Sequence, residues 1–159
     1  MASAPTAAPN AARRVVHLAR RFRTSLSRRP PAVEDEAWAK EHLLAAEVRL
    51  WVQMRNHDRR HAIEVARRYE ARRPGASRAE MAGVLLHDVG KMDSDLGVAG
   101  RVVATVVGPR GRRMRSYHDH ERIGAAACAA AGSDPTTVAL VAGTAEAAML
   151  EALRSADDI

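Results

Sequence analysis

A His-Asp pair, His87 and Asp88, directly follows an apolar stretch in the run GVLLHDVGK, residues 83–91. A carboxylate in such a place is unusual, because a buried aspartate needs a partner group or a metal ion. A neutral imidazole and a carboxylate are both ligands that divalent cations use in proteins. Gly90 follows two positions later and is a natural stop for a helix whose last turn carries the pair. A solvated helix end is the alternative interpretation of these residues.

Two distant segments contain further candidate ligands. His61 lies 26 residues before His87 in the run HAIEVA, where Ile63, Val65 and Ala66 predict one buried helical face. Near the other end of the chain, the run LRSADDI contains Asp157 after an alanine. The order is therefore His, then His-Asp after two leucines, then Asp.

In this order, HAIEVA, LLHDVGK, HERIGAAA and LRSAD resemble segments of the HD superfamily of metal-dependent phosphohydrolases. The resemblance covers roughly residues 55–159, and LLHDVGK is its most specific part. It implies an all-α domain that binds one divalent metal ion (Mn, Mg, Fe, Co or Zn). The ligands that it implies are His61, His87, Asp88 and Asp157. Asp157 is preferred to Asp158 because the Ala-Asp step of the superfamily falls there.

The resemblance also implies contacts to a phosphorylated substrate. Lys91 is similar to a phosphate-contacting lysine of some branches, and a lysine stabilised by the helix dipole is the alternative. His120 matches the later histidine of the superfamily, and His118 lies close to it; surface histidines are the alternative. A basic loop that could steer such a substrate contains Arg110, Arg112, Arg113 and Arg115. Binuclear members carry further histidines before the last aspartate, but residues 136–153 have none, so a single ion is expected.

Composition and charge favour one helical domain behind a basic tail. Aromatic residues make up only 3% of the 159 residues, so the core must consist of Ala, Val, Leu and Met, which suits close-packed helices. Residues 1–33 contain seven arginines and no acid, which leaves 18 basic and 19 acidic residues for the rest. We therefore expect a flexible tail over 1–33, which could contact nucleic acid or an acidic membrane surface, and a domain over 34–159. No apolar stretch approaches the ~18 residues of a membrane span and no secretory signal is evident, so a cytoplasmic protein is expected.

The pattern of apolar residues predicts helices throughout the domain. We expect them at about 34–54, 56–72 with Asn56 as the N-cap, 77–88 with a Ser77–Glu80 capping box, 120–131, and 146–157. Asp134-Pro135 should open another helix. The resemblance favours a helix over 96–108, and 109–117 reads as a loop. Cys128, the only cysteine, is expected to be a small buried hydrophobe and cannot form an intrachain disulfide.

The function that this resemblance implies is metal-dependent hydrolysis of a small phosphorylated molecule, with a nucleotide as the preferred substrate class. Asp88 would orient the attacking water, and Lys91 would neutralise phosphate charge. A non-catalytic binding or scaffold module that keeps the ligands is the alternative. A nucleic-acid or membrane role for the tail ranks behind both, because the chain has few aromatic residues to stack on bases.

Overall fold

The structure is a computed structural model that describes residues 29–91 and 116–158, the backbone alone for 116–119. In these residues the predicted all-α fold is confirmed: they form seven α-helices, one short 3₁₀ helix and no strand. The elements are α2 (Val33–Glu41), α3 (Ala45–Trp51), α4 (Asn56–Arg72), α5 (Arg78–Leu85), η1 (Val89–Lys91), α7 (Ser116–Ala130), α8 (Pro135–Val141) and α9 (Ala147–Asp157). No helix among the described residues is both long and apolar enough to cross a membrane.

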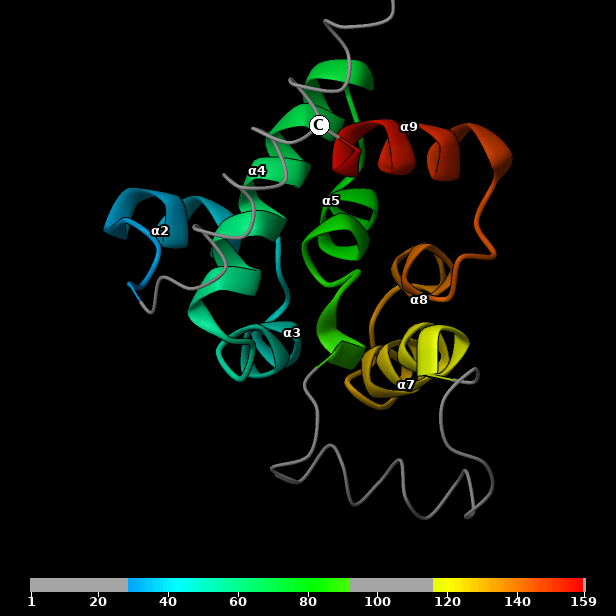
Figure 1. Ribbon diagram of the computed structural model, residues 1–159, viewed down its shortest axis with the longest axis horizontal. Coiled ribbons are helices and arrows are strands. Elements are labelled where there is room, and N and C mark those ends of the chain that lie inside the picture. The colour runs from blue at the N-terminus through cyan, green and yellow to red at the C-terminus, as the bar shows by residue number, and fades with distance from the viewer. Residues whose placement is uncertain (1–28, 92–115, 159) are drawn as a thin grey trace, which may run out of the picture.

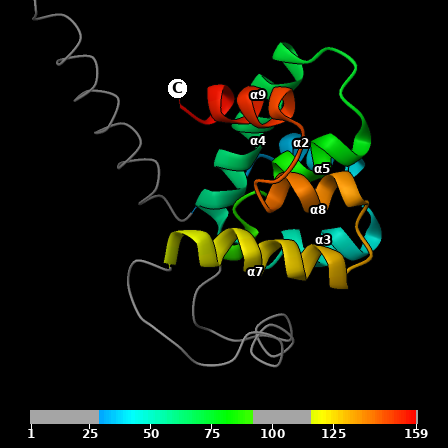
Figure 2. The same cartoon turned by 90° about the vertical axis from the view of Figure 1, so that its right-hand side faces the viewer.

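Helix α5 is the centre of the fold. It packs against α4 on one side and α8 on the other, while α7 packs against α8 and η1 (Figure 1). Helix α9 packs against α4 at the end of the molecule opposite α7, as Figures 1 and 2 show. The largest buried side chains of the shared core are Trp51, Tyr69, Met81, Leu85 and Leu86.

The α4–α5 hairpin determines which residues face each other across the two helices. A short turn joins α4 to Ser77, the N-cap of α5, so the helices run antiparallel. His61 lies 11 residues before the end of α4 and His87 lies 10 residues after Ser77. At about 1.5 Å per helical residue both lie about 15 Å from the turn, so they come level with each other.

A buried carboxylate, Glu80, holds the turn end of this hairpin together. Glu80 is 7% exposed, and its Oε2 accepts hydrogen bonds from the Tyr69 hydroxyl (2.8 Å) and Arg73 Nε (2.9 Å). Burial alone would raise the pKa of Glu80, but these hydrogen bonds outweigh it and hold the pKa below its ordinary value. The predicted capping box with Ser77 is confirmed, and it satisfies amide groups at the start of α5.

Three predicted helix limits are wrong. The expected helix over 34–54 is broken into α2 and α3, because Leu44 is extended and the Glu47 carboxylate accepts its N–H at 2.6 Å. Arg55, not Asn56, is the N-cap of α4. Helix α5 ends at Leu85, so His87 and Asp88 lie after it, in the tighter turns that lead into η1.

Two predicted helix positions and the predicted burial of the cysteine agree with the structure. The last helix and the Asp134-Pro135 helix start lie where the sequence placed them, and Cys128 is fully buried. The expected 109–117 loop is shortened at its end, because α7 begins at Ser116. The expected helix over 96–108 and the tail residues 1–28 lie outside the described residues.

Candidate metal centre

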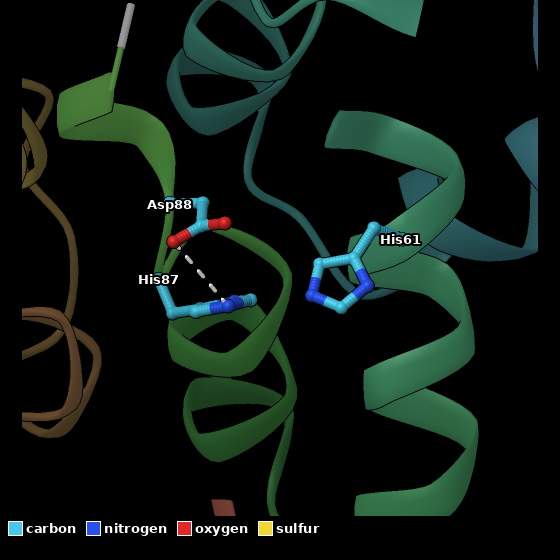
Figure 3. A group of neighbouring side chains, drawn as sticks. All are labelled: His61, His87 and Asp88. Carbon is cyan, nitrogen blue, oxygen red and sulfur yellow. Dashed lines mark ion pairs between the residues drawn. The ribbon is translucent and has the colours of Figure 1, made fainter. Parts of the chain in front are cut away.

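His61, His87 and Asp88 form a cluster between two helices. Each offers one potential ligand atom, and these atoms all lie within 4.8 Å of one another. Figure 3 shows His61 projecting from α4 toward His87 and Asp88, which come from the chain just after α5. The two imidazole centroids are 6.0 Å apart. The level placement of His61 and His87 in the hairpin therefore becomes side-chain proximity.

The imidazole of His87 has a defined hydrogen-bonding state. Its Nδ1 lies 2.8 Å from the Val84 carbonyl oxygen, and because a carbonyl only accepts, Nδ1 is the donor. The lone pair of a neutral ring is then on Nε2. This Nε2 is buried and has no hydrogen-bond partner among the described residues, and it lies 3.5 Å from Asp88 Oδ1. A backbone carbonyl on the other ring nitrogen is the usual arrangement for a histidine that ligates a metal.

Asp88 is a nearly buried carboxylate, 9% exposed, with a cationic neighbour. Lys91 Nζ lies 2.7 Å from its Oδ1 and 2.8 Å from its Oδ2. The lysine supplies the counter-charge that a buried carboxylate needs. Because its side chain is half exposed, Lys91 can leave this position without disturbing the core.

Asp157 reaches the cluster through His61. Its Oδ1 lies 2.7 Å from His61 Nε2, although the two residues are 96 positions apart in sequence. The structure thus brings three of the four sequence-predicted ligands into one cluster, and the contact that ties Asp157 to this cluster is the one with His61. Two ligand atoms at right angles around an ion with 2.1 Å bonds lie about 3.0 Å apart. The His61–Asp157 contact is shorter than that spacing because it is a hydrogen bond in which His61 Nε2–H donates to the carboxylate, and this proton must leave before both groups can hold one ion.

Of the other predicted substrate-contact residues, the structure describes the side chains of Lys91 and His120 only. His120 Nδ1 lies 3.1 Å from the Gly90 carbonyl oxygen, so this histidine donates to the turn that follows Asp88. The side chain of His118 lies outside the described residues, as does the predicted basic loop, Arg110, Arg112, Arg113 and Arg115.

Two features of the site were missed by sequence reasoning. Gly90 was predicted to stop a helix, yet it allows η1 to touch α7: a Cβ there would lie 1.9 Å from the His120 carbonyl oxygen. Arg68 was not considered, although its guanidinium donates to the Ala156 carbonyl, next to Asp157, at 2.8 Å. The seven-residue spacing from His61 to Arg68, two helical turns, was the available signal.

Comparisons of the chain with protein-family models, curated proteins and solved structures gave no match. The kind of ion that the site could bind is therefore inferred from the ligand atoms of its own residues. Two imidazoles and a carboxylate suit borderline or hard divalent ions such as Mn²⁺, Fe²⁺, Co²⁺ and Zn²⁺. The residues present thus fit a divalent metal ion.

Proposed function

We propose that this protein is a metal-dependent phosphohydrolase of the HD type, acting on a small phosphorylated molecule. The observation that carries the proposal is the His87 imidazole, with Nδ1 bonded to a carbonyl and a buried Nε2 left without a hydrogen-bond partner among the described residues. A buried acceptor of this kind costs free energy unless something binds it. His61 and Asp88 lie close enough to share that ligand.

In this proposal the protein side chains hold the ion and order the reactants. His61, His87, Asp88 and Asp157 would be the ligands. Such an ion, when bound, lowers the pKa of a coordinated water and polarises a phosphoryl oxygen. Asp88 would also accept a hydrogen bond from the attacking water and so orient it.

Lys91 would supply positive charge to the substrate. Its ammonium lies against Asp88 at 2.7 Å, and its side chain is half exposed. In the substrate complex Lys91 would turn from Asp88 to contact a phosphate oxygen and neutralise the charge that develops there. His120, whose Nδ1 is held by the Gly90 carbonyl, is the second proposed contact. A nucleotide remains the preferred substrate class on the resemblance alone.

A specific observation favours the non-catalytic module as a second candidate. Lys91 pairs with Asp88 and Asp157 pairs with His61, so protein groups by themselves can satisfy both carboxylates. A helical scaffold could retain these contacts for packing alone. The two candidates differ in whether the fold gains stability from a divalent ion.

Metal-dependent melting of the parent protein and Asp88→Ala tests the proposal. An ion that binds only the folded state adds about 2.7 kcal/mol at 100 times its Kd. For a chain of this length that is a Tm increase of about 5–10 °C. We expect the increase with Mn²⁺ in the parent and its loss in Asp88→Ala, with phosphate released from a panel of nucleotides by the parent only.

Asp157→Ala and Asp158→Ala form a matched pair for the same assay. Asp158 is exposed and lies next to the proposed ligand, so its replacement should leave the metal response unchanged, whereas Asp157→Ala should weaken it. An identical increase of the Tm with Mn²⁺ in the parent and in Asp88→Ala would refute the proposed metal centre. A metal response without phosphate release would favour the scaffold.

A further inference from the structure

One face of α4 holds the last turn of α9 in place. His61, Arg68 and Arg72 are spaced by seven and four residues, so they lie along the same side of the helix. All three contact the end of α9: His61 contacts Asp157, Arg68 contacts Ala156 and Arg72 contacts Ser155. In Figures 1 and 2 the end of α9 lies beside α4.

Arg68 supplies a hydrogen-bond donor for the backbone carbonyl of Ala156. The last carbonyls of a helix have no later amide to bond, and a buried backbone oxygen needs a donor. Ala156 is fully buried, and Arg68 donates to its oxygen at 2.8 Å. A guanidinium at this end of a helix also interacts favourably with the helix dipole. The contact is therefore a charged C-terminal cap supplied by a different helix.

The guanidinium of Arg68 is itself held in place. Its second terminal nitrogen donates to Glu64 Oε2 at 3.2 Å, one turn earlier on α4. Arg72 adds a parallel contact, from its Nε to the Ser155 hydroxyl at 3.1 Å. Two adjacent residues of α9 are thus fixed to α4 immediately before Asp157.

We propose that Arg68 is a positioning residue for the metal centre, which it serves by holding the last turn of α9 so that the Asp157 carboxylate reaches His61. This inference rests on the proposed metal site. Terminal helical turns fray unless something ties them down, and the loss of one turn would carry the carboxylate away from the cluster. The Arg68 cap keeps Asp157 in register with His61, and it does so without touching an ion or a substrate.

The test compares Arg68→Met, Arg68→Lys and Arg67→Met in the full chain. Methionine keeps much of the arginine stem but removes the donor. Arg67 is the matched control, because it lies next to Arg68 but pairs with Asp35 and stacks on Trp38 instead of contacting α9. Mn²⁺ affinity, measured by calorimetric titration, should weaken about tenfold in Arg68→Met, because the loss of a residue that holds a metal ligand in place usually weakens metal affinity by about that factor. Arg68→Lys should recover part of the affinity, and Arg67→Met should match the parent.

A double-mutant cycle shows whether Arg68 acts through Asp157. In the Asp157→Ala background, Arg68→Met should cause no further loss of Mn²⁺ affinity, since the group it positions is gone. An undiminished further loss, or parental affinity in Arg68→Met, overturns the inference while leaving the metal site in place.

Hydrogen exchange without metal separates this inference from the proposed function. The Asp158 amide, bonded to the Arg154 carbonyl at 2.9 Å, reports on the last turn. Its exchange should quicken in Arg68→Met and stay parental in Arg67→Met. Parental exchange in Arg68→Met refutes the positioning role. If the parent binds no divalent ion, the proposed function fails, and the exchange result still decides whether Arg68 holds the helix end.

Discussion

Replacing Gly90 with alanine should damage the site more than it damages the fold. The alanine Cβ would lie 1.9 Å from the His120 carbonyl oxygen, and real Cβ contacts are essentially never shorter than 3.0 Å. The opposing atom is backbone of α7, so η1 and α7 must separate by about 1 Å. Overpacking of this kind typically costs about 1–3 kcal/mol.

The displacement falls two residues from Asp88 and three from His87. Metal-ligand atoms must lie within about 0.5 Å of their productive positions. A displacement of η1 by about 1 Å should therefore cost most of the Mn²⁺ affinity. We would measure chemical unfolding without metal and the Mn²⁺ Kd by calorimetric titration in the same preparations. The expected result is a folded, moderately destabilised protein with Mn²⁺ binding weakened by at least about tenfold.

Gly132→Ala supplies the matched control for this experiment. Gly132 has φ +74° and nothing within 4 Å of an added Cβ, so alanine there costs about 1–2 kcal/mol of backbone strain without a steric clash. It lies at the far end of α7 from His120. Equal Mn²⁺ affinities in the two variants would refute the reasoning, because general destabilisation alone would then account for both.

Two further predictions concern the fold. Because the folded-state pKa of Glu80 is depressed, its stabilising contribution is present above the unfolded value of about 4.5 and is lost as the pH falls through the lower folded value. Chemical unfolding from pH 7 to 3 should show this acid loss in the parent, and Glu80→Gln, about 2 kcal/mol less stable at pH 7, should show a flatter profile; equal slopes would contradict the assignment. Removing residues 1–28 should leave the Tm and Mn²⁺ affinity unchanged, because the described core and all four proposed ligands lie after Arg29. A lower Tm in the truncated chain would show that the tail packs on the domain.

Much of the helical fold was predictable because its signals are local. Apolar periodicity predicted α4, and Ser77 with Glu80 and Asp134 with Pro135 marked helix starts that the structure confirms. The break between α2 and α3 was not predictable in the same way. It depends on a carboxylate, Glu47, accepting the N–H of Leu44, a residue with no capping side chain of its own.

The candidate ligands could be selected from residue type and order, but the contacts that position them could not. His61 and His87 come close because they lie nearly the same number of residues from the turn between α4 and α5, and these numbers can be counted in the sequence. The contact of Gly90 with α7 and the contact of Arg68 with α9 join residues 30 and 88 positions apart. Contacts of that range depend on tertiary packing, which no local pattern encodes.

The origin of the four proposed ligands explains why metal binding and folding should be coupled here. His61 comes from α4, His87 and Asp88 from the turn before η1, and Asp157 from the last residue of α9. An unfolded chain would have to close loops of 26 and 69 residues to bring them together, whereas the folded chain already holds the ligand atoms of His61, His87 and Asp88 within 4.8 Å of one another and Asp157 against His61. An ion should therefore bind the native state far more tightly than the unfolded state. Metal-dependent stability is thus the sharpest measure of whether these residues form a metal centre or only a packed polar cluster.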